Sequence, residues 1–224
     1  MRNALLVFAK WPRPGRVKTR LTPVLTDEEA AALYRAFLLD LLEQTQALHA
    51  DVLIHWAAPV PAGEDPEPFA TRADGMRVQK GNALGARMQH GIQDALSDGY
   101  ERVAVVGSDH PTLPTAFLRE AFSALARPNS ITLGPSYDGG FYLIGMNACY
   151  PQVFADMRYS HPQVLNQTLT RIGQTSARLT VLPRWYDVDT PAALRLMLAD
   201  MDNGQPSTRH TEAAVETLGL RSLV

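Results

Sequence analysis

The 224-residue sequence contains a single cysteine, Cys149, which excludes an intrachain disulfide framework and cannot supply a zinc site alone. Apolar runs long enough to span a membrane are absent. The formal net charge is −2, and this lack of a positive excess argues against a general nucleic-acid binder. The N-terminus shows no signal-peptide cleavage pattern. Together these absences predict a cytoplasmic protein without a membrane span or a nucleic-acid partner.

Two familiar phosphate-binding motifs, GxxxxGK(S/T) and GxGxxG, are missing as well. What remains is an ordinary globular composition, with 46% hydrophobic and 20% charged residues. The length suits one domain with a substantial core. If the protein binds phosphate groups, it therefore does so with a different device.

Short apolar runs alternate with amphipathic stretches along the chain. Buried strands are predicted at residues 4–9, 51–57, 102–106, 130–133, 141–146 and 178–182. Helices are predicted from the capping box at Thr26 and Glu29, from the segment Gln79–Met88 to about Leu96, near Pro114, and from Pro191 after the cap Thr190. This alternation predicts an α/β fold with three α/β/α layers around a mostly parallel, mixed sheet. The paired runs around residues 134–146 suggest one antiparallel element.

A loop rich in proline, glycine and cations directly follows the first predicted strand. Open α/β sheets bind ligands at the carboxyl ends of their strands, so the loop predicts an anionic ligand, most simply a phosphate chain. Gly15 lets the backbone approach such a ligand closely. The cations that can neutralise phosphate oxygens are Lys10, Arg13, Arg16, Lys18 and Arg20. The alternative is a solvated basic loop.

Acidic residues follow two later segments. Asp109 lies in a turn of small residues that directly follows the strand-like run 102–106. Mg²⁺ prefers one or two carboxylates together with substrate phosphates, so Asp109 is a candidate metal ligand. Asp187 and Asp189 point to the same side if their segment is extended, so one of them could be a second metal ligand. Helix capping is the alternative for Asp109 and for the Asp187/Asp189 pair.

Glycines mark two further turns. Asp138 precedes a glycine pair and could hold an acceptor or serve as a base, although a hairpin turn explains the same residues. Gly85 and Arg87 could contact a base or phosphates from the start of a helix. The alternative there is an N-terminal turn with a surface arginine.

Five motifs carry a family resemblance. They are FAKWPRPGRVKTRL at 8–21, KGNALGARM at 80–88, GSDHPTL at 107–113, GPSYDGGFYLIGM at 134–146 and YDVDTP at 186–191. In this order they resemble the bacterial DUF2064 proteins, over residues 4 to about 200. The resemblance implies the Rossmann-like nucleotide-diphospho-sugar transferase (GT-A) fold, similar to that of molybdenum-cofactor and phospholactate guanylyltransferases. Residues 1–202 would then form a single nucleotide-binding transferase domain, and 203–224 a polar tail or short helix.

The resemblance also implies roles for individual residues. The loop from Ala9 to Leu21 matches the phosphate-contacting first loop, and Asp109 matches the aspartate that binds Mg²⁺ or Mn²⁺. The Asp187/Asp189 pair matches the region of a second metal ligand. Metal-dependent glycosyltransferases typically have Asp-x-Asp after the central strand, whereas this sequence has one carboxylate there.

The predicted site has four groups of residues. The catalytic residues are Lys18, Arg20 and Asp138; the nucleotide- and phosphate-binding residues are Ala9, Lys10, Gly15, Arg16, Lys18, Arg20, Gly81, Gly85, Arg87 and Ser108; the acceptor-binding residues are Asp138, Gly139 and Gly140; and the metal ligands are Asp109, Asp187 and Asp189.

Three functions are compatible with this sequence. The first is metal-dependent transfer of a sugar from a nucleotide-diphospho-sugar, which the family resemblance favours. The second is nucleotidyl transfer from an NTP to a phosphorylated acceptor, as in a guanylyltransferase, which the density of cations in the first loop favours. The third is a nucleotide-binding protein without turnover. In the first two cases the partners are a nucleotide or nucleotide-sugar and a small-molecule acceptor.

Overall fold

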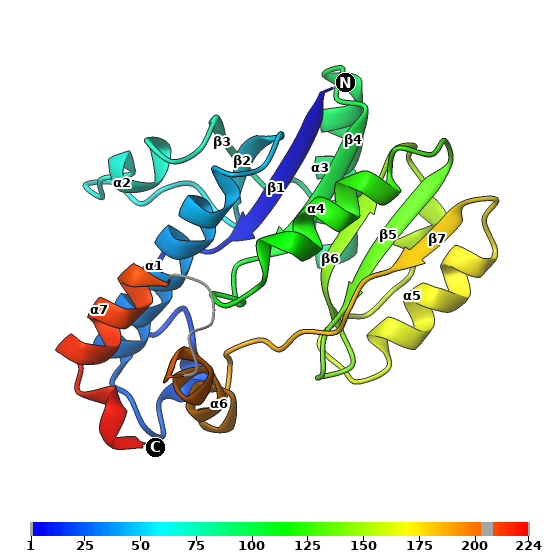
Figure 1. Ribbon diagram of the computed structural model, residues 1–224. Coiled ribbons are helices and arrows are strands. Elements are labelled where there is room, and N and C mark those ends of the chain that lie inside the picture. The colour runs from blue at the N-terminus through cyan, green and yellow to red at the C-terminus, as the bar shows by residue number, and fades with distance from the viewer. Residues whose placement is uncertain (1, 203–207, 224) are drawn as a thin grey trace.

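Strand β1 (Asn3–Ala9) shows how the sequence generates layers, because its side chains alternate between two hydrophobic cores. Leu5 and Val7 pack into one core, and Leu6 and Phe8 pack into the other. The computed structural model describes residues 2–202 and 208–223, and in it the sheet lies between two layers of helices (Figure 1). The α/β/α layering predicted from the sequence is therefore confirmed.

The seven strands of the sheet follow the order β3-β2-β1-β4-β6-β5-β7. After β1 the strands are β2 (Asp51–Trp56), β3 (Gly75–Val78), β4 (Arg102–Gly107), β5 (Ser130–Pro135), β6 (Phe141–Met146) and β7 (Arg178–Val181). Strand β6 runs antiparallel to β4 and β5, and the other neighbouring strands are parallel. Consequently the carboxyl ends of the parallel strands and the amino end of β6 meet at one edge of the sheet.

Helices cover both faces of this sheet. They are α1 (Asp27–Thr45), α2 (Glu67–Ala70), α3 (Leu84–Ser97), α4 (Thr115–Ala124), α5 (Val164–Gly173), α6 (Pro191–Asp202) and α7 (Arg209–Thr217), with short 3-10 turns η1 (Thr19–Leu21), η2 (Pro151–Val153) and η3 (Leu220–Leu223). Side chains of α1, α4, α6 and α7 join the core that contains Leu5, and those of α3 and α5 join the other. None of the helices in the described part of the chain has the length and apolar character needed to cross a membrane.

Helix starts follow the predicted caps. Thr26 Oγ1 accepts the Glu29 N–H at 3.2 Å, while the Thr26 N–H donates to Glu29 Oε2 at 2.7 Å, so the capping box of α1 is present. At α6 the Ala193 N–H donates to Thr190 Oγ1 at 3.3 Å, and Pro191 is the first helical residue. Both predictions are confirmed.

Three elements lie where the sequence analysis predicted none. Strand β3 and the short helix α2 fall between the predicted strand 51–57 and the helix predicted to end near Leu96, and α5 falls in residues 151–177. Strand β3 is an edge strand with Met76 37% and Val78 44% exposed, so it lacks the apolar run of a buried strand. Helix α5 does bury Val164, Thr168 and Ile172 at helical spacing, a signal that was present in the sequence.

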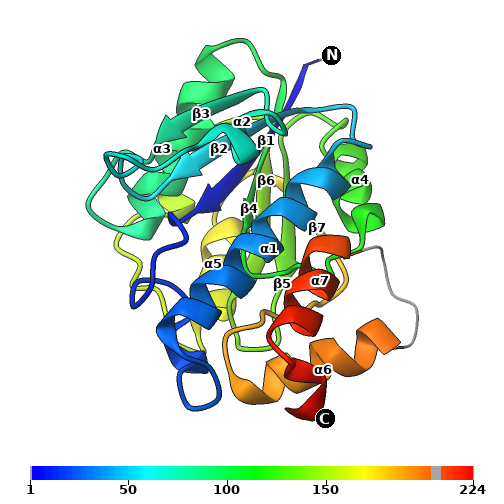
Figure 2. The same ribbon diagram turned by 90° about the vertical axis from the view of Figure 1, so that its left-hand side faces the viewer.

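Helix α7 lies beside α1 (Figure 2) and is capped by a side chain from it. The buried Asp40 of α1 accepts the His210 N–H at 2.9 Å and the Thr211 N–H at 2.7 Å, which satisfies two donors in the first turn of α7. Val215 of α7 is fully buried against the same core. The predicted domain boundary at residue 202 remains a prediction, and residues 203–207 lie outside the described residues.

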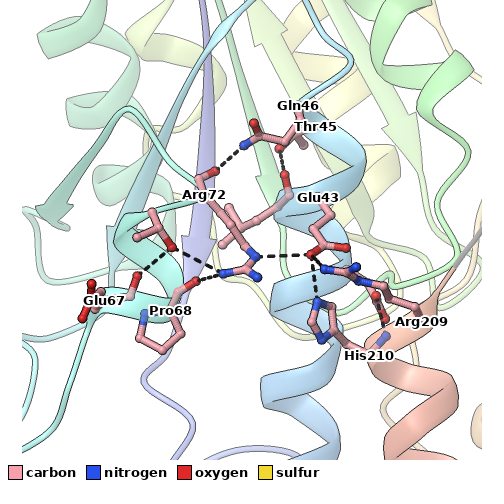
Figure 3. A network of polar contacts seen from close by, with 11 residues as sticks. Glu43, Thr45, Gln46, Glu67, Pro68, Arg72, Arg209 and His210 are labelled. Carbon is pink, nitrogen blue, oxygen red and sulfur yellow. Dashed lines mark hydrogen bonds and ion pairs between the residues drawn. The ribbon is translucent and has the colours of Figure 1, made fainter.

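A second carboxylate strengthens the same attachment (Figure 3). Glu43 Oε1 accepts the Arg72 Nε–H at 3.3 Å, contacts His210 Nε2 at 2.9 Å, and forms an ion pair with Arg209. Burial alone would raise the pKa of Glu43, but the bonds from His210 and Arg209 lower it to about 2. The polar network therefore ties α1, α7 and the segment after α2 together.

Candidate active site

A pocket of about 530 Å³ lies at the edge of the sheet where the carboxyl ends meet. The loops after β1, β3, β4 and β7 contribute to its lining, as does the turn between β5 and β6. That turn reaches the pocket because β6 is antiparallel, so its amino end lies at this edge. The location agrees with the ligand position of open α/β sheets.

Residues of opposite charge line the pocket. The basic set consists of Lys10, Arg16, Lys18, Arg20 and Arg87, and the acidic set consists of Asp109, Asp138, Asp187 and Asp189. Ala9, Ser108 and Gly140 also contribute to the lining. The structure thus brings together most of the residues predicted from sequence, although their roles stay predictions.

Four predicted glycines are not among the lining residues: Gly15, Gly81, Gly85 and Gly139. Gly15 has φ +67° in a turn closed by the Arg16 N–H on the Arg13 carbonyl at 3.0 Å, so it shapes the basic loop from outside the pocket. A Cβ on Gly85 would lie 2.8 Å from Tyr159 Oη and 2.9 Å from the Phe154 carbonyl oxygen. Gly85 therefore allows the β6–α5 connection to pack on α3.

The start of α3 holds Arg87 in a fixed position. Its Nε–H donates to the Gly81 carbonyl at 2.9 Å, and its NH1 group donates to Gln79 Oε1 at 3.5 Å. Gln79 in turn donates from Nε2 to the His55 carbonyl at 2.7 Å. Gln79 thus uses its amide nitrogen on His55 and its amide oxygen on Arg87. These bonds orient the Arg87 guanidinium at this corner of the pocket.

Lys18 occupies the junction of the basic and acidic sets. Its backbone is left-handed, with φ 50° and ψ 30°, and its side chain is only 1% exposed. The ammonium forms ion pairs with Asp109 Oδ1 and, at 2.8 Å, with Asp189 Oδ1. Burial would lower the pKa of Lys18, but the two carboxylates outweigh it and raise the pKa above its ordinary value. Lys18 therefore stays protonated and positively charged.

Asp109 is placed by main-chain and side-chain contacts around the end of β4. Its carbonyl oxygen accepts the Val188 N–H at 2.9 Å, which joins the loop after β4 to the segment before α6. The preceding Ser108 bonds Tyr34 Oη at 2.7 Å. Burial would raise the pKa of Asp109, yet the Lys18 ammonium holds it below its usual range. The carboxylate is thus kept ionised.

Asp187 has the opposite electrostatic environment. Burial raises its pKa, and the neighbouring carboxylates Asp138 and Asp189 raise it further. The acidic set therefore gathers more negative charge than Lys18 compensates. Such a cluster attracts cations or donor groups of a ligand.

The predicted turn at Asp138 is a tight structure in its own right. Asp138 Oδ1 accepts the Ser136 hydroxyl at 2.6 Å and the Gly140 N–H at 2.8 Å. Gly139 has φ +89°, and a Cβ there would lie 2.2 Å from the Pro162 carbonyl oxygen. Gly139 is thus required by packing against the loop before α5, while Asp138 and Gly140 line the pocket.

Sequence reasoning missed several lining residues from that loop. Tyr159, Ser160 and His161 all line the pocket. Tyr159 Oη is buried and has no hydrogen-bond partner among the described residues. Ser160 has φ 68°, an uncommon conformation for a residue other than glycine that often occurs at functional sites. Residues Tyr159–Pro162 fall in a stretch without a helical or strand pattern. Such a stretch indicates a loop, and loops often carry binding residues.

The acidic set matches a hard divalent cation by its chemistry, since Mg²⁺ and Mn²⁺ prefer carboxylate oxygens. From the predicted set Asp109, Asp187 and Asp189, the ligands would be Asp109 and one of the other two. In the described residues, a different group of three side chains has its potential metal-ligating atoms close together. It consists of Asp40, Glu43 and His210. That second group is not suited to a metal, because its oxygens already accept the backbone amides and cations that attach α7.

Comparisons with known proteins agree with this architecture. The 2-phospho-L-lactate guanylyltransferase of Halorubrum lacusprofundi is 29% identical over 205 residues, covering 85% of this chain and 84% of that protein. A crystal structure from Desulfovibrio desulfuricans G20, provisionally described as a nucleotide-diphospho-sugar transferase, has 34% identity and a TM-score of 0.87, covering 100% of this chain and 99% of that one. A cytidylyltransferase from Leptospira borgpetersenii has 10% identity and a TM-score of 0.56, covering 100% and 97%, and shows similarity of fold alone.

The fold is that of the nucleotide-diphospho-sugar transferases and nucleotidyltransferases, as the family resemblance implied. A model of the family DUF2064, described as an uncharacterized protein conserved in bacteria, matches residues 40–161, more than half of the chain. The chain belongs to this family.

Proposed function

We propose that this transferase is a nucleotidyltransferase that joins an NTP to a phosphorylated small-molecule acceptor and releases pyrophosphate. The observation that carries the proposal is the concentration of Lys10, Arg16, Lys18 and Arg20, from a single loop, in the lining of one pocket. A triphosphate needs more cationic partners than the diphosphate of a nucleotide-sugar, and arginine binds phosphate oxygens in pairs. The relative of similar length from Halorubrum lacusprofundi, named a guanylyltransferase, supports the same reaction class.

In this reaction an acceptor phosphate oxygen attacks the α-phosphorus of the NTP. The bond between the α-phosphorus and the oxygen that bridges to the β-phosphorus breaks, and pyrophosphate leaves with that oxygen. Arg16, Arg20 and Lys10 would bind the departing pyrophosphate and stabilise its charge. A Mg²⁺ or Mn²⁺ ion held by Asp109 and one of Asp187 and Asp189 would neutralise charge on the phosphates. The chain's own contribution is to align the phosphate chain and to keep Asp109 ionised.

Sugar transfer is the second candidate. It is favoured by the 34% identity, over the whole chain, to the protein described as a nucleotide-diphospho-sugar transferase. It is also favoured by Asp138, which lines the pocket and whose Oδ1 is held by Ser136 and Gly140. In that reaction Asp138 would orient an acceptor hydroxyl or remove its proton.

A thermal unfolding screen with Mn²⁺ separates the two, because a ligand that binds the native state raises the melting temperature. Stabilisation by NTPs but not by nucleotide-diphospho-sugars supports nucleotidyl transfer, and the reverse supports sugar transfer. Pyrophosphate release, followed by phosphorus NMR with candidate acceptors, then tests turnover. A protein stabilised by neither class of nucleotide would contradict both proposals.

Substitutions in the basic loop test the carrying observation. Replacing Arg16 and Arg20 together by Ala should weaken NTP binding by about 10–100-fold per lost contact, from a charge-assisted bond of roughly 1.5–3 kcal/mol. Binding of the nucleoside alone should change little. Arg13→Ala is the matched control, since Arg13 belongs to the same loop and is not among the pocket-lining residues. Equal losses for triphosphate and nucleoside would show that the loop does not bind phosphates.

A further inference from the structure

Lys18 differs from the other pocket cations in how completely the fold encloses it. Its side chain is 1% exposed, and its ammonium lies 5.6 Å from the ring centre of Tyr34 and 5.5 Å from that of Phe37. Arg16 and Arg20, in contrast, are exposed. A lysine held among aromatic rings and carboxylates has a built position rather than a solvated one.

The position of the ammonium is the one that a bridging cation would take. Asp109 Oδ1 and Asp189 Oδ1 both contact Lys18 Nζ, so one oxygen of each carboxylate is already used by a positive charge. These two aspartates belong to the predicted metal-ligand set. A divalent ion that used the same oxygens would lie at contact distance from the ammonium and would be repelled by it.

We infer that Lys18 is a resident cation of the cleft, and that a divalent ion bound by Asp109 Oδ1 and Asp189 Oδ1 displaces its ammonium. The inference rests on the proposed metal site. The backbone of Lys18 stays in place, because its carbonyl accepts the Leu21 N–H at 2.8 Å, while its four-carbon stem can carry the ammonium elsewhere.

The phosphate chain of a nucleotide offers the displaced ammonium a new partner. Lys10 and Arg16 line the same pocket, so phosphates bound by them lie within the reach of the loop that carries Lys18. Metal and nucleotide therefore favour each other's binding, since each one makes the movement of Lys18 less costly. Metal alone binds weakly.

Lys18→Met tests this directly, because methionine keeps a flexible apolar stem and removes the charge. Mn²⁺ affinity without nucleotide, measured by calorimetry and by electron paramagnetic resonance, should be at least tenfold tighter than in the wild type. The coupling between Mn²⁺ and NTP should shrink accordingly. Lys18→Arg retains the charge and should bind Mn²⁺ as weakly as the wild type.

Two controls define the outcome. Arg13→Met removes a positive charge from the same loop, and Arg13 is not among the pocket-lining residues, so Mn²⁺ affinity should change less than threefold. Asp109→Asn should abolish Mn²⁺ binding in both the wild type and the Lys18→Met background. If Asp109→Asn leaves Mn²⁺ binding intact, the proposed metal site is wrong. If Asp109→Asn abolishes it and Lys18→Met brings no gain, only the role of Lys18 is overturned.

A measurement on the wild-type chain covers the case in which Lys18→Met fails to fold. The sequence contains three lysines, Lys10, Lys18 and Lys80, so carbon-13 labelling of lysine gives a short, assignable set of Cε signals. Addition of Mg²⁺ and NTP together should shift the Lys18 signal to a new position at the same midpoint as binding. A Lys18 signal that stays unchanged while metal and nucleotide bind would refute displacement.

Discussion

Replacing Gly139 by Ala should destabilise the protein through the turn that holds Asp138. Gly139 has φ +89°, and a positive φ costs a residue with a Cβ about 1–2 kcal/mol. The new Cβ would also lie 2.2 Å from the Pro162 carbonyl oxygen, and an overpacked site of this kind costs about 1–3 kcal/mol. The sum, about 2–5 kcal/mol, is a large part of the 5–15 kcal/mol by which a typical protein is stable.

Gly63→Ala is the matched control for the backbone term alone. Gly63 has φ +83°, close to that of Gly139, but a Cβ there meets nothing within 4 Å. Equilibrium unfolding in urea should therefore show a loss of about 1–2 kcal/mol for Gly63→Ala and a clearly larger loss for Gly139→Ala. Equal losses in the two variants would refute the steric argument.

Three further predictions concern other parts of the molecule. Tyr159→Phe should change the free energy of unfolding by less than about 0.5 kcal/mol, because Tyr159 Oη has no partner among the described residues. Because Tyr159 lines the pocket, the same substitution should weaken binding of the pocket's ligand in calorimetry, and unchanged affinity would exclude that hydroxyl from the site. Asp40→Ala should lower the free energy of unfolding by about 2–4 kcal/mol, since two backbone amides of α7 lose their acceptor. Amide hydrogen exchange in α7 should become faster, and Asp40→Asn, which keeps an oxygen, should cost less. Exchange in Asp40→Ala as slow as in the wild type would contradict the capping role. The pKa of Glu43 is lowered from 4.5 to about 2, so the stability that Glu43 contributes is present above pH 4.5 and is lost as the pH falls toward 2. Glu43→Gln should therefore remove this part of the pH dependence of the free energy of unfolding. A pH profile identical to that of the wild type would refute the prediction.

The layers of the fold could be predicted because their signals are local. The capping box at Thr26 and Glu29 and the apolar run of β4 are contained in a few neighbouring residues, and the structure has the corresponding elements. Helix α5 carries a comparable local signal in Val164, Thr168 and Ile172. Strand β3 could not be found in the same way, because an exposed edge strand is defined by its neighbour β2 rather than by its own apolar residues.

The candidate site was predictable as a set of residues but not as a set of contacts. Asp109 and the basic loop follow strands, and strand ends are recognisable in a sequence. The ion pairs of Lys18 with Asp109 and Asp189 join positions far apart in the chain, so no local pattern encodes them. The same holds for Gly139, whose need for glycine arises from Pro162 in another loop. Long-range contacts of this kind follow from the folded backbone.

The hydrogen bond from the Val188 N–H to the Asp109 carbonyl has a practical consequence. Val188 stands between Asp187 and Asp189, so this main-chain bond joins the loop after β4 to the segment that carries the other two acids. The side chains of His110 and Thr112 reinforce the junction through their bonds to Tyr186. Asp187→Asn leaves that main-chain hydrogen bond and both ion pairs of Lys18 intact. The cleft can therefore be prepared with one carboxylate fewer and the same links between its loops, so that ligand preference is compared at two charges.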